Sequence, residues 1–124
     1  MLFKVDIRGE NDILKKIINH KFPLNRELNI AGKDTNCLEI TKSGIHKGFA
    51  LSKLSRYLNI NLNDIIVFGN EDNDIPMFEV AGWSIAMGNS PKEVKEKAKS
   101  IAPDDYEEGV LWGIRKILQY KWEA

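Results

Sequence analysis

Acid and amide side chains crowd a short segment that follows the pattern of a buried strand. The apolar run 65–68 is typical of a strand buried on both faces, and Gly69 and the sequence Asn-Glu-Asp-Asn-Asp at 70–74 come directly after it. Ligands of open α/β sheets bind at the carboxyl ends of the strands. Oxygen-rich side chains suit a hard cation such as Mg²⁺, and the amino end of the next helix suits an anion such as phosphate. The same composition is also that of a solvated turn, and the spacing alone does not decide between the two.

A second candidate is Lys47, in the sequence Gly-Ile-His-Lys-Gly at 44–48. It enters a predicted helix, where its ammonium could neutralise a bound phosphate as a point charge. A solvated lysine is the simpler interpretation of Lys47 taken alone. However, Lys47 and Asp74 both lead into helices of the same expected sheet, which would place the two side chains at one edge of that sheet.

The elements that must position these residues follow the alternating pattern of a parallel sheet with covering helices. From residue 44 onwards, strands are expected at 65–68, 83–87 and 100–102, and helices at 46–58, 75–81, 91–99 and from 107. Asp74 is the expected N-cap of the second helix, ahead of Pro76. The first and last helices are each expected to present one apolar face, formed by Ala50, Leu51, Leu54, Tyr57 and Leu58 in the first and, as a buried stripe, by Val110, Leu111, Ile114, Ile117 and Leu118 in the last.

The first 43 residues show a different order of predicted strands and helices. Alternation over 2–7 predicts a strand, apolar positions from Ile13 to Ile18 predict a helix that ends before Pro23, and two short strands are expected around 28–30 and 38–40. One helix and three short strands are too few to form a complete hydrophobic core by themselves. This segment is therefore expected to be part of a larger unit.

Composition and charge exclude several classes of protein. The chain has 124 residues, of which 43% are hydrophobic and 29% charged, as in one globular domain. Eighteen basic and eighteen acidic residues give a formal net charge of zero, which argues against binding of nucleic acid or anionic membranes. No window approaches the roughly 20 apolar residues that span a bilayer, and the N-terminus lacks a secretory signal pattern. A cytoplasmic location is expected.

The remaining reactive side chains favour ordinary structural roles. With one cysteine, Cys37, and two histidines, His20 and His46, a zinc site built mainly from Cys and His is excluded, so metal chemistry must use carboxylates. The histidines are expected to be ordinary polar residues rather than general bases. Cys37 lies in a predicted strand with no His-plus-Asn set near it, so a catalytic thiol is not expected. The three tryptophans are expected in the core or an interface rather than on an aromatic binding surface; they are Trp83, Trp112 and Trp122.

Four stretches together resemble the haloacid dehalogenase (HAD) superfamily, specifically the Cof-type phosphatases with a large α/β cap. They are LEITKSGIHKGFAL at 38–51, IIVFGNEDNDIPMFEVAG at 65–82, SIAMGNSPKEVKEKA at 84–98 and DDYEEGVLWGIRKIL at 104–118. The resemblance implies an α/β fold in which residues 44–124 form the C-terminal half of a Rossmann-like, three-layer α/β/α core. Residues 1–43 would be the C-terminal part of the α/β cap.

The resemblance also implies roles for individual residues. Lys47 matches the lysine that steadies the nucleophile and the phosphate. Gly69, Asn70, Asn73 and Asp74 match a loop that binds Mg²⁺ and contacts phosphate, with Asn70 and Asp74 as the metal positions and Asn73 as a phosphate contact. Asn70 stands where the family has a metal-binding aspartate. An amide keeps an oxygen ligand but removes the charge, so Mg²⁺ binding is expected to be weakened.

The family's nucleophile segment, DxDGT/V, is not convincingly present in this sequence. Asp6 is the nearest candidate because it follows a predicted strand and precedes a glycine. Arg8 stands where an acid/base aspartate is needed, and Glu10 would put negative charge where phosphate must sit. Asp6 is therefore expected to be a surface residue of a cap strand, and no nucleophile is identified.

Two functions follow from this sequence. The first is a Mg²⁺-dependent phosphatase of small phosphorylated metabolites, present as a C-terminal fragment that is catalytically incomplete alone. The alternative is a non-catalytic remnant or an oligomeric assembly module. Because open sheet edges and apolar patches drive association, a symmetric homodimer or a separate N-terminal half is the expected partner.

Overall fold

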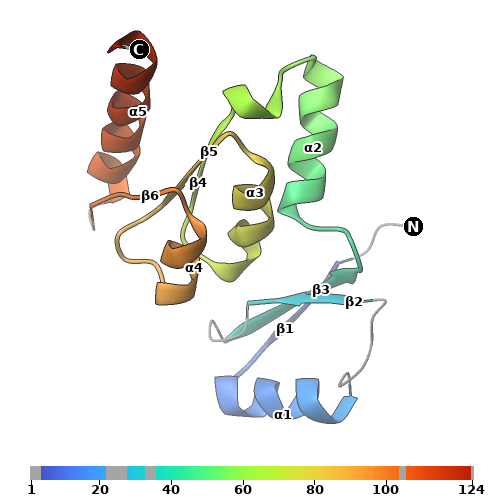
Figure 1. Cartoon of the computed structure of the whole chain (residues 1–124). Helices are drawn as coiled ribbons and strands as arrows, with labels where there is room; N and C mark the ends of the chain where they lie inside the picture. Colours follow the sequence, from blue (N-terminus) through green and yellow to red (C-terminus); the bar gives the residue numbers. More distant parts are fainter. Residues whose placement is uncertain (1–3, 22–27, 33–35, 104–105, 124) are drawn as a thin grey trace.

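Two three-stranded sheets form the framework of the protein. The computed structural model describes residues 4–21, 28–32, 36–103 and 106–123. In these residues one sheet is antiparallel, with the strand order β1-β3-β2, and the other is parallel, with the order β4-β5-β6. Figure 1 shows the antiparallel sheet below the parallel one, with residues 43–46 connecting β3 to the first helix of the upper unit. The expected mixed α/β fold is confirmed.

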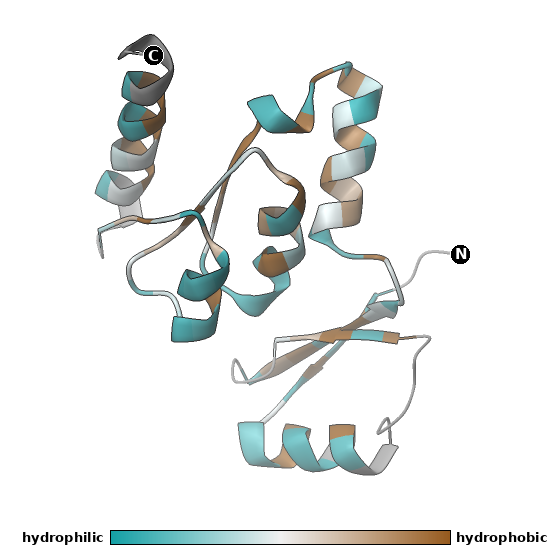
Figure 2. Ribbon diagram, in the orientation of Figure 1, coloured by the Kyte–Doolittle hydropathy of each residue, from teal (hydrophilic) through white to brown (hydrophobic). Residues whose placement is uncertain are grey.

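The antiparallel unit consists of three strands and one covering helix. Its elements are β1 (Lys4–Arg8), α1 (Asn11–Lys21), β2 (Leu28–Ala31) and β3 (Cys37–Lys42). Leu38 and Ile40 of the central strand β3 are buried, as is Leu14 of α1, the helix that lies under this sheet. Side chains alternate across a strand, so Glu39 and Thr41 belong to the opposite face. Figure 2 shows the same alternation of hydrophobic and hydrophilic residues along these strands.

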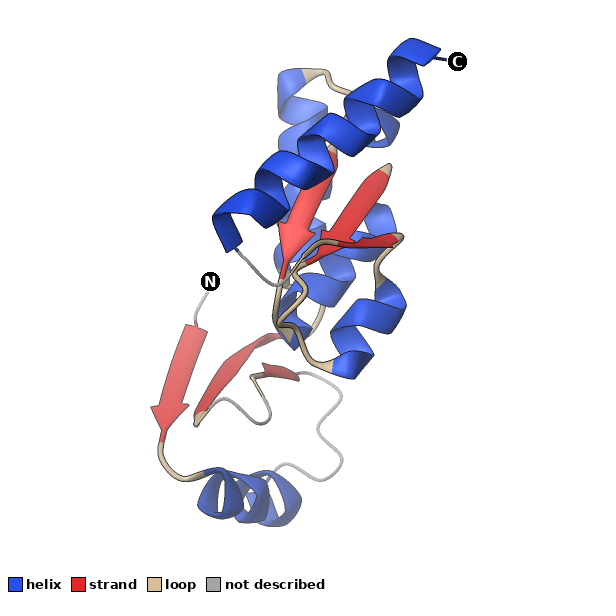
Figure 3. Ribbon diagram, turned by 90° about the vertical axis from the view of Figure 1, so that its left-hand side faces the viewer, coloured by secondary structure: helices blue, strands red, loops and turns tan. Residues whose placement is uncertain are grey.

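The parallel unit has helices on both faces of its sheet. Its elements are α2 (Lys47–Leu58), the 3₁₀ turns η1 (Leu62–Asp64) and η2 (Asp72–Asp74), β4 (Ile66–Gly69), α3 (Ile75–Val80), β5 (Trp83–Ala86), α4 (Lys92–Lys97), β6 (Ser100–Ile101) and α5 (Tyr106–Glu123). Figures 1 and 3 place α5 on one face of the strands and α3 and α4 on the other.

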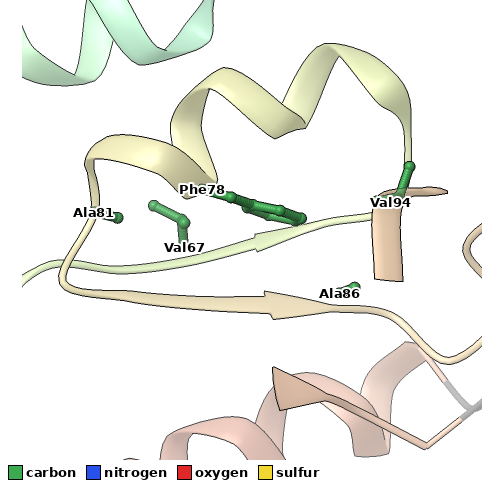
Figure 4. Close-up of a cluster of buried hydrophobic side chains, with 5 residues drawn as sticks. All are labelled: Val67, Phe78, Ala81, Ala86 and Val94. Carbon is green, nitrogen blue, oxygen red and sulfur yellow. The ribbon is translucent and has the colours of Figure 1, made fainter. Parts of the chain in front are cut away.

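Two apolar clusters hold these layers together. The first lies between the sheet and helices α3 and α4, and Figure 4 shows its buried members: Val67, Phe78, Ala81, Ala86 and Val94. The second lies between the sheet and α5, and its buried members are Ile85, Met87, Ala102 and Ile117. Neighbouring positions of one strand supply opposite clusters, as Ile85 and Ala86 do, because successive side chains of a strand point to opposite faces.

The expected elements are found among the described residues, with boundaries shifted by a few positions. The first strand begins at Lys4 in the described part of the chain, and residues 2–3 of the expected strand lie outside it. Within the described ranges, no helix combines the length and the apolar character needed to cross a bilayer.

The apolar faces of α2 and α5 are only partly buried, and for α5 this corrects the prediction of a buried stripe. In α2, Leu54 is 52% exposed and Tyr57 is 87% exposed, while only Leu51 of that stripe packs against the core. In α5, Ile117 is buried, but three apolar residues are exposed: Leu111, Ile114 and Leu118. The reason is the narrow sheet. Its three described strands cover only part of α5, and α2 packs on α3 rather than on the sheet.

Candidate functional site

The loop after β4 is organised around the buried carboxylate of Asp74. Its Oδ2 accepts hydrogen bonds from the backbone N–H groups of Asn70 at 2.9 Å and of Glu71 at 3.2 Å. The side chain fills the space beside Gly69, where an added Cβ would lie 2.5 Å from Asp74 Cβ. A glycine is therefore required at the end of β4 for the loop to fold back over it.

Asp74 stands at the predicted N-cap position of α3, but its side chain does not cap that helix. Its backbone is already helical, with φ −87° and ψ −18°, and its side chain makes no capping hydrogen bond to α3. The sequence pattern did not indicate the 3₁₀ turn η2, which precedes α3 directly. This turn directs the carboxylate back toward the loop instead of forward along the helix.

The second oxygen of Asp74 meets Lys47. Oδ1 forms an ion pair and hydrogen bond with the Lys47 ammonium, although the two residues are 27 positions apart. The Lys47 side chain is 50% exposed, whereas that of Asp74 is 5% exposed. A buried carboxylate thus holds an ammonium group that remains accessible from outside.

The start of α2 places Lys47 over this loop. His46 caps the helix, because its Nδ1 accepts from the backbone N–H of Phe49 at 3.1 Å, so the interpretation of this histidine as an ordinary polar residue agrees with its contacts. Next to Lys47, Gly48 touches the first turn of α3: an added Cβ would lie 2.3 Å from the carbonyl oxygen of Pro76. Lys47 therefore supplies the cation, and Gly48 allows α2 to approach α3 closely enough to bring that cation to Asp74.

A cavity of about 390 Å³ lies between this loop and the antiparallel sheet. Lys47 and Asn73 line it from the parallel unit, and Lys4, Glu39 and Thr41 line it from the antiparallel sheet. Because cross-strand partners share a face, the pairs Lys4–Thr41 and Asp6–Glu39 place four polar side chains on one face of that sheet. The polar face of the antiparallel sheet therefore forms one wall of the cavity.

Hydrogen bonds order this wall. The Glu39 carboxylate accepts from Lys4 Nζ at 2.9 Å through Oε1 and from Asn73 Nδ2 at 3.2 Å through Oε2. Thr41 accepts from Asn29 Nδ2 at 3.3 Å and donates to the carbonyl oxygen of Ile45 at 2.8 Å. The hydrogen bond from Lys4 lowers the pKa of the Glu39 carboxyl against the opposing effect of partial burial. Glu39 is therefore ionised at neutral pH.

A second contact joins the sheet to the loop. The backbone N–H of Gly32, just after β2, donates to both carboxylate oxygens of Asp72, at 3.0 Å and 2.9 Å. Together with the Glu39–Asn73 hydrogen bond, it connects the antiparallel sheet to two successive residues of the 70–74 loop.

Four residues of the cavity wall were not predicted from the sequence as site residues: Lys4, Asn29, Glu39 and Thr41. A signal was present, since period-two alternation sets Glu39 and Thr41 opposite the apolar side chains of β3. Alternation identifies a polar face, but it does not tell whether water or another part of the chain covers that face.

The remaining described residues considered from the sequence lie away from the contact between Lys47 and Asp74, except for the backbone of Asn70. Asn70 is exposed and does not line the cavity, although its backbone N–H binds Asp74. Asp6 lies in the antiparallel strand β1, with Oδ1 3.5 Å from Lys4 Nζ. Cys37 is half-buried in β3. Trp83 and Trp112 pack against the second apolar cluster, as expected. The side chains of His20 and Trp122 lie outside the described part of the chain.

The loop residues alone do not fit a magnesium ion. Their oxygens are the right ligand type, and Asn73 Oδ1 is buried without a hydrogen-bond partner among the described residues. However, Asn70 and Asn73 are uncharged, and the one carboxylate at the family's metal positions, Asp74, is already paired with Lys47. No group of three or more His, Cys, Asp or Glu side chains arranged for metal binding is found in the described ranges. The loop residues that the family resemblance assigns to the site therefore lack the negative charge that Mg²⁺ needs, and Asp72, another carboxylate of the loop, already accepts hydrogen bonds from the Gly32 backbone N–H.

Comparison with known proteins identifies the family and agrees with the fold. A family model described as haloacid dehalogenase-like hydrolase matches residues 1–114. The chain is similar to a 5-amino-6-(5-phospho-D-ribitylamino)uracil phosphatase of Bacillus subtilis, with 33% identity over 106 residues, which cover 86% of this chain and 43% of the relative.

Solved structures show the same likeness in three dimensions. One is a haloacid dehalogenase-like hydrolase from Bacillus subtilis, with a TM-score of 0.76 and 26% identity, covering 87% of this chain and 38% of that one. Another is a sugar phosphatase of HAD subclass IIB, with a TM-score of 0.79 over 93% of this chain and 43% of that one; its 21% identity shows the fold alone. The chain spans about two fifths of the length of these relatives. It belongs to the haloacid dehalogenase-like hydrolases of the Cof type.

Proposed function

We propose that this chain carries one half of the phosphate site of a phosphatase that acts on small phosphorylated metabolites. The observation that carries the proposal is the meeting of Lys47 with Asp74 beside Asn73, at the mouth of a cavity between two sheets. An accessible ammonium held by a buried carboxylate can bind a phosphate without losing its position. The homology to HAD-family phosphatases supports the same chemistry.

In this proposal each matching residue has one role. Lys47 binds phosphate and steadies the nucleophile, and Asn73 donates a hydrogen bond to a phosphate oxygen. Asp74 holds Lys47 and, with Asn70, contributes oxygen ligands toward Mg²⁺. The other carboxylates of the metal site would come from outside these 124 residues, because Asn70 and Asp74 alone supply too little charge at the matching positions. The nucleophile would come from outside as well, because this sequence lacks a match to the family's nucleophile segment. Bound Mg²⁺ would neutralise charge on the phosphoryl group.

The domain assignment belongs to the same proposal. Residues 44–124 would be the C-terminal half of the catalytic core, and residues 1–43 the C-terminal part of the cap. The parallel sheet with helices on both faces supports the first assignment, and the separate antiparallel sheet with one helix supports the second. The cavity between them would then receive the organic part of the substrate. Its wall of Lys4, Asn29 and Glu39 suits a leaving group that carries hydroxyl groups. A cytoplasmic location stays a prediction.

The purified chain is expected to bind inorganic phosphate without hydrolysing an aryl phosphate. With 4-nitrophenyl phosphate and Mg²⁺, no metal-dependent turnover should exceed that of an Asp74→Ala variant. In a phosphate titration followed by NMR, Lys47→Met should weaken binding at least threefold, since the exposed ammonium is the main anion contact. Lys53→Met is the matched control because Lys53 lies on the same helix and contacts Phe49 instead.

Two results would contradict this proposal. Equal phosphate affinity in Lys47→Met and in the unsubstituted chain would remove the assigned phosphate role. Turnover that Asp6→Asn abolishes would show that β1 carries a nucleophile and that the chain is catalytically complete.

An assembly module is the second candidate function, and the exposed apolar side chains favour it. Leu54 of α2 and three positions of α5, Leu111, Ile114 and Leu118, are substantially exposed. In addition, β4 pairs on one side only within the described residues. Such surfaces and edges drive association.

Sedimentation equilibrium at micromolar concentration is therefore expected to show a dimer or larger species. Leu111→Glu combined with Leu118→Glu should shift the distribution toward monomer, because the charges must be desolvated on association. Glu108→Gln, on the same helix, serves as a control for altered charge. A stable monomer across this concentration range would count against the assembly module.

A further inference from the structure

Glu39 is the central polar group between the two sheets. It lies on β3, the middle strand of the antiparallel sheet, and its carboxylate contacts Lys4 on one side and Asn73 on the other. We propose that Glu39 is a positioning residue that fixes which way the Asn73 side-chain amide is turned, and that Lys4 determines which oxygen of Glu39 is left for this task. The positioning rests on contacts within this chain, and only its effect on phosphate rests on the proposed function.

The hydrogen-bonding chemistry of the three groups allows one arrangement. A carboxylate only accepts hydrogen bonds and an ammonium only donates them. Lys4 Nζ donates a hydrogen bond to Oε1 of Glu39 at 2.9 Å, so Oε2 is the oxygen that accepts from Asn73. The Asn73 atom that faces Oε2 at 3.2 Å must therefore be Nδ2, the donor end of the amide. Glu39 is held on both sides, because its strand pairs with β1 and with β2.

The charge state of Glu39 supports this arrangement. The Lys4 ammonium and the Asn73 amide both lower the pKa of the Glu39 carboxyl, while partial burial raises it. The carboxyl is therefore in its acceptor-only form at neutral pH. Two further charged residues of β1 share this face: Asp6, with Oδ1 3.5 Å from Lys4 Nζ, and Arg8. Lys47 approaches from α2, and its positive charge also lowers the pKa of Glu39.

The orientation of Asn73 matters for an anion in the cavity. Nδ2 carries two hydrogens, and Glu39 takes one of them, which leaves a second donor on a residue that lines the cavity. A turned amide would present its oxygen instead and would repel phosphate. The buried Oδ1, which has no hydrogen-bond partner among the described residues, shows that the orientation is not set by a contact to the oxygen. Glu39 thus selects the orientation that suits an anion.

A conservative substitution should reverse this selection. In Glu39→Gln, Lys4 is expected to keep its hydrogen bond to residue 39, now through the new amide oxygen, so the glutamine NH₂ group should face Asn73. Asn73 must then turn and present Oδ1. Removing the ammonium as well, in the Lys4→Met/Glu39→Gln double variant, frees the glutamine to turn and offer its oxygen to Asn73 again. Lys4→Met alone leaves an acceptor-only carboxylate, and the amide of Asn73 should keep its orientation.

Isotope-labelled NMR of the full chain tests this directly. The Asn73 Nδ2 protons should show cross-relaxation with the side-chain methylene protons of residue 39 in the unsubstituted chain, in Lys4→Met and in the double variant. This signal should be lost in Glu39→Gln. Asp6→Asn is the matched control, because it also converts a carboxylate near Lys4 to an amide but does not contact Asn73. An unchanged signal in Glu39→Gln would overturn the proposal. Loss of the signal in Lys4→Met would do the same, and this variant remains informative if Glu39→Gln does not fold.

A phosphate titration separates this inference from the proposed function. If both hold, Glu39→Gln should weaken inorganic phosphate binding at least threefold, and the double variant should regain affinity relative to Glu39→Gln. If the NMR pattern is as expected but the unsubstituted chain binds no phosphate, the proposed function fails and the positioning of Asn73 by Glu39 stands. If phosphate binds while Asn73 keeps one orientation in every variant, the positioning role fails.

Discussion

Replacing Asp74 with alanine is expected to lower the free energy of unfolding by about 3 kcal/mol. The buried carboxylate accepts from two backbone N–H groups, of Asn70 and Glu71, and pairs with Lys47. Its removal leaves both N–H groups without their acceptor and opens space beside Gly69. Urea denaturation followed by circular dichroism measures the change.

Lys47→Met separates the two contributions to this effect. Because half of the Lys47 side chain is exposed, the ion pair is screened by water and its loss should cost only about 1 kcal/mol or less. The loop would then be held mainly by the hydrogen bonds from its own backbone. Equal losses in Lys47→Met and Asp74→Ala would contradict this account and would make the ion pair the dominant interaction.

Gly48→Ala is expected to destabilise the protein by about 2 kcal/mol, although alanine is the better helix former. Helix propensity alone would give a gain of up to about 1 kcal/mol. However, the new Cβ would lie 2.3 Å from the carbonyl oxygen of Pro76 and 2.7 Å from its carbonyl carbon, so α2 and α3 must separate. Overpacking of this kind costs about 1–3 kcal/mol, and backbone atoms cannot turn aside as a side chain would. Thermal and urea unfolding give the measurement.

The separation of the helices should also weaken the Lys47–Asp74 contact. Gly9→Ala is the control, since its Cβ would meet only Leu14 Cδ2 at an ordinary 3.7 Å. A Gly48→Ala protein as stable as the original would mean that α2 is not held against α3 at this point.

The strands and helices of this protein could be predicted from the sequence because their patterns are local. The continuous apolar run of β4 and the alternation in β3 each identify a strand. The polar segment at 70–74 could be recognised as a candidate site because it follows a buried strand, and Lys47 because it begins a helix of the same sheet.

Other features depend on contacts between distant parts of the chain, which no local pattern contains. The role of Glu39 required knowing that the polar face of β3 lies against Asn73. The incomplete burial of Leu111 depends on how few described strands lie beneath α5, and that of Leu54 on the packing of α2 against α3 instead of the sheet. The missing capping bond from the Asp74 side chain has a partly similar origin, because Oδ1 pairs with Lys47 from 27 positions away, while Oδ2 accepts from the backbone of its own loop.

The separation of the two apolar clusters from the antiparallel sheet has a consequence for dynamics. Every buried member of both clusters comes from residue 67 or later, so the layers of the parallel unit do not depend on residues 4–42 for their packing. Hydrogen bonds from Gly32 to Asp72 and from Asn73 to Glu39 connect the units instead. Breaking them is a local opening, with a lower free energy than global unfolding. The antiparallel sheet can therefore move away from the loop while the layers of the parallel unit stay folded, and such an opening would take away one wall of the cavity.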